Sequence, residues 1–300
     1  MKPTWKKYLL YARNTILKNL LILILLIILG QIILSGYPES WTGFGAYTSP
    51  TGEYVREKTL WDWMQLLIIP LFLTGAAVSL NRSEKNVERQ LAEDRAKLER
   101  DIANDRQQEA ALQAYLDRMS DLLLREKLRT SENEEVRDVA RIRTLTVLRG
   151  LDARRKGLVV NFLHEAGLIS NKKTIVELRG ADLRGADLHI AFLQDAHLLG
   201  ANLRHANLNS ANLTDAHVEM ASLEYANLKY ASLMGATLEY ANLRSANLSS
   251  ASLVDANLTS ADLEGAILKY ADLRGANLTD ANLEGIDLRG ATMPDGTKHE

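Results

Sequence analysis

Two short segments of the chain carry residue types that bind metal ions. The tripeptide Asp-Ala-His occurs at residues 195–197 and again, 20 residues later, at 215–217. Carboxylate oxygens and imidazole nitrogens are common ligands of zinc and related divalent ions. A chain that returns to the same point every 20 residues would stack the two segments; the alternative interpretation is that stacked polar pairs only contact water. The candidate metal ligands are Asp195, His197, Asp215 and His217.

The rest of the sequence gives no indication of catalysis. It contains no glycine-rich phosphate-binding loop, no nucleophile elbow and no HExxH motif. Its 300 residues include no cysteine, which excludes disulfides and thiolate metal sites and is compatible with a reducing compartment. We therefore expect a protein that is not an enzyme, with no catalytic residues and no cofactor.

A period of five residues organises the C-terminal part of the chain, from Val176 to Met293. In the 23 five-residue units from Ala181 onward, the first residue is Ala 22 times and the third is Leu 21 times. A helix repeats every 3.6 residues and a strand every two, so neither presents this pattern on one face. A coil that turns a corner every five residues does, with Ala and Leu inside and the other positions in water. Repeats that bury a face only against their neighbours form a solenoid.

The motif A(D/N)LXX closely resembles that of the pentapeptide repeat proteins. The resemblance implies a right-handed, quadrilateral β-helix with 20 residues per coil, so that residues 176–293 would make about six coils. At a strand spacing of about 4.8 Å, this solenoid would be roughly 29 Å long. The structural residues inside one of its sides would be Ala181, Ala201, Ala221, Ala241, Ala261 and Ala281, with Leu183, Leu203, Leu223, Leu243, Leu263 and Leu283.

The outward residues of such a coil sort into four sides of unequal charge. The sides centred on Leu183 and Leu188 carry seven acidic and six basic residues, whereas those centred on Leu193 and Leu198 carry nine acidic and two basic ones. An acidic side attracts a basic partner or imitates the phosphates of duplex DNA. Tyrosines are typical anchors of protein interfaces, although they also cover a solenoid that has no partner. The candidate partner-binding residues are Asp195, Asp215, Glu219, Glu239, Asp255, Tyr225, Tyr230, Tyr240 and Tyr270.

Two apolar runs near the N-terminus, 16–34 and 63–80, are each long enough to cross a bilayer as a helix. A cleaved signal peptide is the competing interpretation of the first run, but no small-residue cleavage pattern follows Leu34. Residues 1–19 contain five Lys or Arg and residues 81–100 contain six. The loop between the two runs, residues 35–60, contains two. The positive-inside rule then predicts a multi-pass protein of the bacterial cytoplasmic (inner) membrane, with the lipid bilayer as one partner and both termini in the cytoplasm.

Residues 81–129 form a charged segment without Gly or Pro, which predicts a helical stalk. Apolar residues recur on it at spacings of three and four, and Asp105 and Glu109 interrupt this stripe. One interpretation is a coiled coil that makes a homo-oligomer and transmits signals; the other is a helix that packs on the next domain. The stripe consists of Val87, Leu91, Leu98, Ile102, Leu112, Leu116, Met119 and Leu123.

Residues 130–175 are predicted to form two helices that cap the first coil of the solenoid. Ser131 and Glu134 have the spacing of a capping box for the first helix, and the second should run from about Ala153 to Ala166. The block 141–169 resembles a segment of bacterial membrane-bound pentapeptide repeat proteins. The cap face would use Leu158, Val159, Phe162 and Leu163 to cover the open end of the coil. The basic run Arg154, Arg155 and Lys156 is interpreted as solvated charge, with anionic lipid headgroups as the alternative partner.

These observations divide the chain into eight parts. They are a basic cytoplasmic N-terminus (1–15), span one (16–34), an external loop (35–62), span two (63–80), the stalk (81–129), the cap (130–175), the solenoid (176–293) and a tail (294–300). The predicted function is a non-enzymatic, membrane-anchored scaffold whose rigid surface binds an unknown cytoplasmic protein, with no nucleic acid partner. The alternatives are a DNA mimic that acts on a type II topoisomerase through the acidic side, and a signal transducer that works through the stalk.

Overall fold

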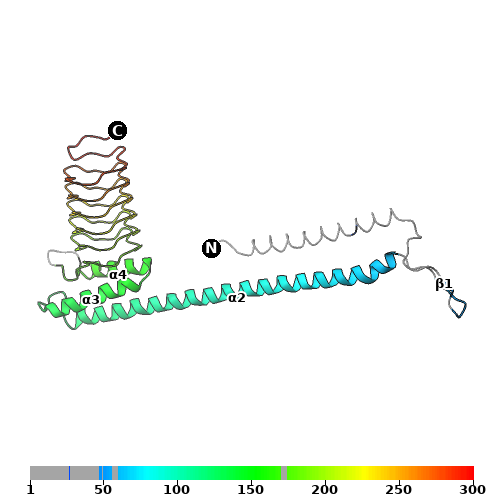
Figure 1. Ribbon diagram of the computed structural model, residues 1–300. Coiled ribbons are helices and arrows are strands. Elements are labelled where there is room, and N and C mark those ends of the chain that lie inside the picture. Colours follow the sequence, from blue (N-terminus) through cyan, green and yellow to red (C-terminus); the bar gives the residue numbers. More distant parts are fainter. Residues whose placement is uncertain (1–26, 28–46, 49, 56–59, 170–173) are drawn as a thin grey trace. The chain divides into compact units, whose positions relative to one another are not determined.

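The computed structural model describes residue 27 and residues 47–48, 50–55, 60–169 and 174–300 (Figure 1). For residues 47, 48, 55 and 60–68 it describes the backbone alone. The chain divides into two compact units, Met1–Ala96 and Lys97–Glu300, which we describe separately. The division falls within the predicted stalk, so the second half of the stalk belongs with the cap and the solenoid.

The first unit contains a short hairpin and the beginning of a long helix. Strands β1 (Tyr47–Thr48) and β2 (Tyr54–Val55) pair in antiparallel fashion within the segment predicted as an external loop. Helix α2 (Leu60–Leu124) has 65 residues and contains Pro70. It ends five residues before the predicted end of the stalk.

The structure describes the second predicted membrane span as part of a helix but describes almost none of the first. The first, 16–34, lies outside the described residues except for Ile27. The second, 63–80, is part of α2, and the side chains of 63–68 lie outside the described residues. Among the residues whose side chains are described, no helix combines the length and the apolar character that a bilayer crossing requires. The two predicted spans therefore find no support in the described residues.

Two further helices form the cap. Helix α3 (Glu134–Gly150) begins after Asn133, whose side chain accepts a hydrogen bond from the Glu135 amide at 2.9 Å. The predicted capping box is wrong, because Ser131 lies two residues before the N-cap and its hydroxyl accepts from the Asn133 amide instead, at 3.2 Å. Helix α4 (Ala153–Glu165) has Asp152 as its N-cap, which accepts from the Arg155 amide at 2.8 Å.

The end of α2 packs on the cap through the second half of its apolar stripe. Leu112 and Met119 are buried, and Leu116 and Leu123 pack against the same core. The Tyr115 hydroxyl lies 2.9 Å from Thr144 Oγ1 of α3 in the interior, where burial raises the pKa of this tyrosine well above its usual value. The second interpretation of the stripe therefore holds for this part of the stalk. The remaining stripe residues, Val87, Leu91, Leu98 and Ile102, are exposed.

Helix α4 covers the first coil of the solenoid, as the sequence predicts (Figure 1). Val159, Val160 and Leu163 are buried, and the Asp187 amide of the first coil donates to the Ala153 carbonyl at 2.9 Å. Leu158, which the sequence assigns to this contact, is 45% exposed because it lies on the opposite face of the helix from Val160. Glycine at 157 permits the close approach, since a Cβ there would lie 2.1 Å from the Asp187 carbonyl oxygen.

The solenoid repeats every 20 residues, as the five-residue pattern predicts. Parallel bridges join the second residue of each five-residue repeat to its counterpart one coil further on, from Asp182 with Asn202 to Asp272 with Thr292. From Ala181 up to the last coil, each five-residue repeat makes three backbone bonds to the next coil. In the repeat 181–185 they involve the amides of Asn202, Leu183 and Gly185, at 2.8 to 2.9 Å. The corner closes with a bond from the next Ala amide to the Leu carbonyl. Ala and Leu thus fill the interior, and the chain changes direction at each fifth residue.

The last coil is less buried than the others. Ala281 is half-buried and Leu283 is 37% exposed, because none of the residues that the structure describes forms a further coil on residues 276–285. These two members of the predicted interior set therefore differ from their ten counterparts. The tail folds back on one side, where Lys298 pairs with Thr292 in antiparallel fashion and the Gly290 amide donates to the His299 carbonyl at 2.8 Å.

Candidate partner-binding surfaces of the solenoid and its joint with the cap

The four sides of the solenoid are named by their first complete coil. Side A contains Leu183, side B Leu188, side C Leu193 and side D Leu198, each with its counterparts at intervals of 20 residues. The fifth residue of each unit lies at the corner to the next side and has a positive φ, as at Asp195 (56°) and Tyr225 (57°). Every predicted partner-binding residue therefore occupies either a side or a corner column.

The predicted acidic residues fall into two groups. Asp195, Asp215 and Asp255 lie in one column, at the corner between sides C and D. The Asp215 carboxylate packs on Gly235 of the next coil, where a Cβ would lie 2.2 Å from its Oδ1. Asp255 packs on Gly275 in the same way. This column therefore forms a ridge of carboxylates, which is interrupted at Gly235 and Gly275.

Glu219 and Glu239 belong instead to the hydrogen-bonded ladder of side D. Glu219 accepts from the Thr237 hydroxyl at 2.6 Å and lies 3.3 Å from His217 Nδ1. Burial opposes ionisation of Glu219, but these bonds outweigh it and hold the pKa of its carboxyl below the usual value. Glu239 accepts a hydrogen bond from the Asn257 amide nitrogen. Both carboxylates therefore form bonds within the solenoid, whereas the aspartates lie at the corner.

The four predicted tyrosines occupy corner positions and are more than half exposed. Tyr225 stacks on His205, with ring centroids 5.0 Å apart, and Lys229 Nζ lies 4.7 Å from the Tyr230 ring centroid. The Tyr270 ring covers Gly290, where a Cβ would lie 2.5 Å from the ring. Tyr240 is 60% exposed. Three of these rings therefore contact neighbouring residues of the solenoid, and all four remain accessible to a partner.

The predicted metal ligands do not form a cluster. His197 and His217 are bridge partners with ring centroids 4.8 Å apart, but their carboxylate neighbours are Glu177 and Glu219. The aspartates of the two tripeptides project from the corner, whereas the histidines lie on side D. In the part of the chain that the structure describes, no three His, Asp or Glu side chains are placed to hold a metal ion. The described residues therefore give the candidate metal site no support.

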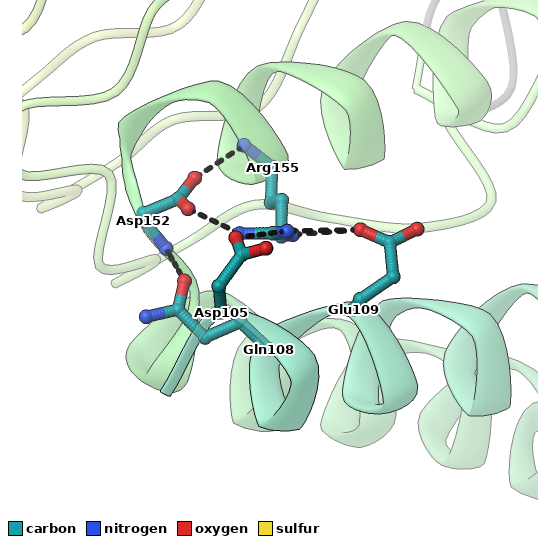
Figure 2. A network of polar contacts seen from close by, with 5 residues as sticks. All are labelled: Asp105, Gln108, Glu109, Asp152 and Arg155. Atoms are coloured by element: carbon teal, nitrogen blue, oxygen red, sulfur yellow. Dashed lines mark hydrogen bonds and ion pairs between the residues drawn. The ribbon is translucent and has the colours of Figure 1, made fainter. Parts of the chain in front are cut away.

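A joint that the sequence did not predict connects α2 with α4 (Figure 2). The Arg155 guanidinium binds three carboxylates, those of Asp152 at 2.5 Å, Asp105 at 2.7 Å and Glu109 at 2.9 Å. The Asp105 bond is the largest of the effects that raise the pKa of Arg155 above its usual value. Gln108 completes the network by accepting from the Asp152 amide at 2.8 Å. The acidic residues that interrupt the α2 stripe thus serve as the docking site of α4.

The next residue, Lys156, connects α4 with the solenoid. Its side chain is buried, and Nζ lies 3.4 Å from Asp182 Oδ1 and 3.1 Å from the Arg184 carbonyl. Asp182 also accepts from the Arg184 side chain, which is the main reason that its pKa is lowered to about 2. The run Arg154 to Lys156 is therefore not simply solvated charge. The signal in the sequence was the pair of acids at spacing four on an otherwise apolar helix face.

The stacked five-residue units define a β-solenoid of the quadrilateral class. A family model of pentapeptide repeats (8 copies) matches residues 177–219, 221–255 and 256–293. Residues 177–293 are therefore similar to the pentapeptide repeats of this family model, as the sequence motif indicated.

Several solved structures resemble this region. HetL, a pentapeptide repeat protein involved in heterocyst differentiation regulation in the cyanobacterium Nostoc sp. strain PCC 7120, is 39% identical over 41% of this chain and 66% of its own, with a TM-score of 0.28. A pentapeptide repeat protein of the cyanobacterium Cyanothece 51142 is 42% identical over 30% and 58% of the two chains, with a TM-score of 0.19. QnrB1, a plasmid-mediated fluoroquinolone resistance protein, is 18% identical over 39% and 68%, also with a TM-score of 0.19. This chain thus spans just under two thirds of HetL. Comparison with curated proteins gives no match.

Proposed function

We propose that the solenoid is a non-enzymatic scaffold that binds a protein partner through its exposed corner tyrosines. The observation that carries the proposal is the backbone conformation at Tyr230 and Tyr270, where φ is 62° and 58°. A left-handed backbone costs a residue with a side chain roughly 1–2 kcal/mol, so bulky residues there need a compensating role. Ser210 and Ser250 occupy the same corner column with a smaller side chain. Tyrosine is enriched among the residues that dominate protein interfaces.

A serine exchange tests this proposal without disturbing the fold. We expect the double variant Tyr230→Ser, Tyr270→Ser to fold like the wild type, because serine already occupies the alternate coils of that column. Capture of interacting proteins from cells, followed by binding measurements with the identified partner, should show at least a tenfold loss of affinity. Met220→Ser is the matched control, since Met220 is an exposed corner residue that is not a tyrosine and Ser260 occupies its column. Equal binding by wild type and double variant would contradict the proposal.

Membrane attachment forms part of the proposal and rests on the sequence. The apolar runs 16–34 and 63–80 and the excess of Lys and Arg on their outer flanks favour two spans with both termini in the cytoplasm. Fractionation of cells, with alkaline carbonate washing, checks attachment, and accessibility of tags at each terminus checks the orientation. Release of the protein into the washed supernatant would contradict it.

The joint at Arg155 favours a second candidate function, transmission of a signal from the stalk. A guanidinium shared by α2 and α4, next to a buried lysine that binds the first coil, links stalk and solenoid through one helix. A response in cells that needs the full-length chain and is lost on Arg155→Met would support it. The topoisomerase alternative is tested separately by DNA supercoiling assays with the purified protein, where an undiminished gyrase rate would exclude it.

A further inference from the structure

We infer that two copies of the chain associate through side A of their solenoids, with the two solenoids antiparallel. This inference goes beyond the scaffold function and does not depend on it. It rests on the order of charges along side A and on the shapes of its two corners.

The fourth residue of every unit on side A is charged. Backbone bonds between successive coils, such as those from the Gly185 amide to the Arg204 carbonyl and from the Gly265 amide to the Glu284 carbonyl, both at 2.8 Å, keep these residues in one column. In the same position on sides B, C and D, at most three of six residues are Asp, Glu, Lys or Arg. The column reads Arg184, Arg204, Glu224, Arg244, Glu264 and Glu284.

This order of charges is complementary to its own reverse. Read from the first coil, the signs are plus, plus, minus, plus, minus, minus; read from the last coil, every sign is inverted. A two-fold axis that crosses the column between Glu224 and Arg244 therefore places an opposite charge against each residue. The facing pairs are Arg184 with Glu284, Arg204 with Glu264, and Glu224 with Arg244, each formed twice. Such a self-complementary surface is what an isologous dimer requires.

The neighbouring column of side A fits the same symmetry. It consists of the second residues of the units, and the axis pairs Asp182 with Asn282, Asn202 with Asp262, and Ser222 with Asn242. Each pair joins a hydrogen-bond acceptor with a group that can donate, and no two carboxylates face each other. The second column thus raises no electrostatic obstacle to the arrangement.

The corners of side A are complementary in shape as well. At the corner with side D, the axis brings Met220 against Tyr240 of the second copy; these side chains are 64% and 60% exposed. At the corner with side B, the stacked pair of His205 and Tyr225 meets Gly265 and Ser245 of the second copy. Large side chains therefore meet small ones at one corner, and an apolar contact forms at the other. Burial of exposed Met and Tyr would supply the apolar part of the interface.

Existing contacts within each copy hold the charged side chains on this surface. Arg204 lies 2.6 Å from Glu224, and Arg244 lies 3.2 Å from Asp262 and also contacts Glu264. These side chains lose less freedom on association because they are already positioned. One side of a solenoid roughly 29 Å long is smaller than the about 800 Å² per partner of a standard interface. The dimer should therefore be weak and sensitive to salt.

Charge reversal with the full-length chain tests the inference. Sedimentation velocity over a concentration series, with protein in a mild detergent, should show a monomer–dimer equilibrium for the wild type. Glu224→Arg and Arg244→Glu each place like charges against each other twice and should each raise the dissociation constant at least tenfold. An equimolar mixture of the two variants should restore dimers, because each reversed charge then faces an opposite one. Lys229→Glu on side B, which changes the net charge as much as Arg244→Glu does, should leave the equilibrium unchanged.

A cysteine experiment tests the register, since the wild-type chain contains no cysteine. Under mild oxidation, a mixture of Met220→Cys and Tyr240→Cys chains should form disulfide-linked dimers, and neither variant alone should do so. A wild type that stays monomeric, variants that dimerise like the wild type, a mixture that fails to recover, or self-linking of one cysteine variant would each overturn the inference. Recovery in the mixture also shows that both charge variants are folded.

Discussion

Corner residues set the conformational demands of the solenoid. Its backbone is left-handed at 23 corners, and glycine occupies eight of them. Asp and Ser tolerate this conformation because their short polar side chains bond locally, whereas Tyr, Met and Ile do so at greater cost. The bulky corner residues include Met220, Tyr225, Tyr230 and Tyr240 in the middle coils, with Ile190 and Tyr270 nearer the two ends. The proposed contacts therefore involve positions where a side chain has a conformational cost.

The cost of a corner side chain can be measured at Gly200. Its φ is 62° and a Cβ there would meet no atom within 4 Å, so Gly200→Ala changes only the backbone preference. We expect this substitution to lower the free energy of unfolding by about 1 kcal/mol. Ser260→Ala, in the same column at a φ of 56°, should change it by less than about 0.5 kcal/mol. Denaturant titrations followed by circular dichroism give both values; a larger loss for Ser260→Ala would contradict this account of the corners.

Asp182, in the first coil of the solenoid, should make the free energy of unfolding depend on pH. Its carboxyl pKa is lowered to about 2 from a usual 3.8, chiefly by hydrogen bonds from Arg184. A lowered folded-state pKa stabilises the fold above the unfolded value, and this contribution is lost as pH falls from about 4 to about 2. Because the group is partly exposed, we expect a contribution of about 1 kcal/mol. The free energy of unfolding of wild type should therefore fall more than that of Asp182→Asn over this interval. Arg184→Gln should remove most of this difference in pH dependence between wild type and Asp182→Asn. If the unfolding free energies of wild type and Asp182→Asn change in parallel with pH, the proposed role of Asp182 is wrong.

At the residue level, the sequence predicted the interior better than the polar contacts. Period five determines which side chains point inward, because the pattern of Ala and Leu is itself the packing requirement. The partners of Arg155 and Lys156 were not predictable in this way, since they come from α2 and from the first coil. Likewise, Asp195 and His197 are close in sequence, but Asp195 lies at the corner between sides C and D and His197 lies on side D. Sequence spacing alone does not specify the direction in which a side chain projects from a corner.

Among the elements, α4 has the most demanding position. It contacts the first coil at the Asp187 carbonyl oxygen and α2 through Arg155, so it must satisfy two surfaces at once. The sequence correctly predicted its approximate bounds, and Gly167, with a φ of 63°, follows its end. It did not reveal which face meets the coil, and Leu158 was therefore assigned to the wrong face. Amphipathic patterns are ambiguous in a helix that is covered on two sides.

Gly157→Ala tests the docking of α4 on the solenoid. The added methyl group would lie 2.1 Å from the Asp187 carbonyl oxygen, so the helix has to move away from the coil. We expect a loss of about 2 kcal/mol in unfolding free energy, typical of an overpacked contact. Gly150→Ala is the control, because a Cβ there meets nothing within 4 Å. Thermal melts that place the two variants within one degree of each other would show that the contact is not tight.

The Arg155 network predicts a salt-sensitive attachment of α2 to the cap. Arg155→Met keeps a long side chain but leaves three carboxylates, Asp105, Glu109 and Asp152, without their shared cation. We expect faster hydrogen exchange in the second half of α2 and in α4, and a lower melting temperature than for Arg154→Met, its exposed neighbour. Arg155→Lys should recover only part of the effect, because an ammonium group cannot reproduce the forked geometry. Identical exchange in the Arg155→Met and Arg154→Met variants would mean that apolar packing alone holds the joint.

Across the compact unit Lys97–Glu300, the local stability against unfolding should vary along the solenoid axis. Each coil packs on its two neighbours, so a middle coil has twice the contact of the last one. Leu243 is fully buried in a middle coil, whereas Leu283 occupies the same column in the last coil and is 37% exposed. A leucine truncation therefore removes very different amounts of packing at these two positions.

Leu243→Ala should cost 2–5 kcal/mol by opening a cavity between coils, whereas Leu283→Ala should cost roughly 1 kcal/mol or less, because the last coil relaxes into the space. Hydrogen exchange provides the spatial check. The Leu283 variant should exchange faster only in residues of the last coil, and the Leu243 variant should weaken protection on both sides of the cavity. Uniform loss of protection in both variants would show that the solenoid unfolds as a single unit, in which case the N-terminal cap stabilises the most distant coil as much as the first.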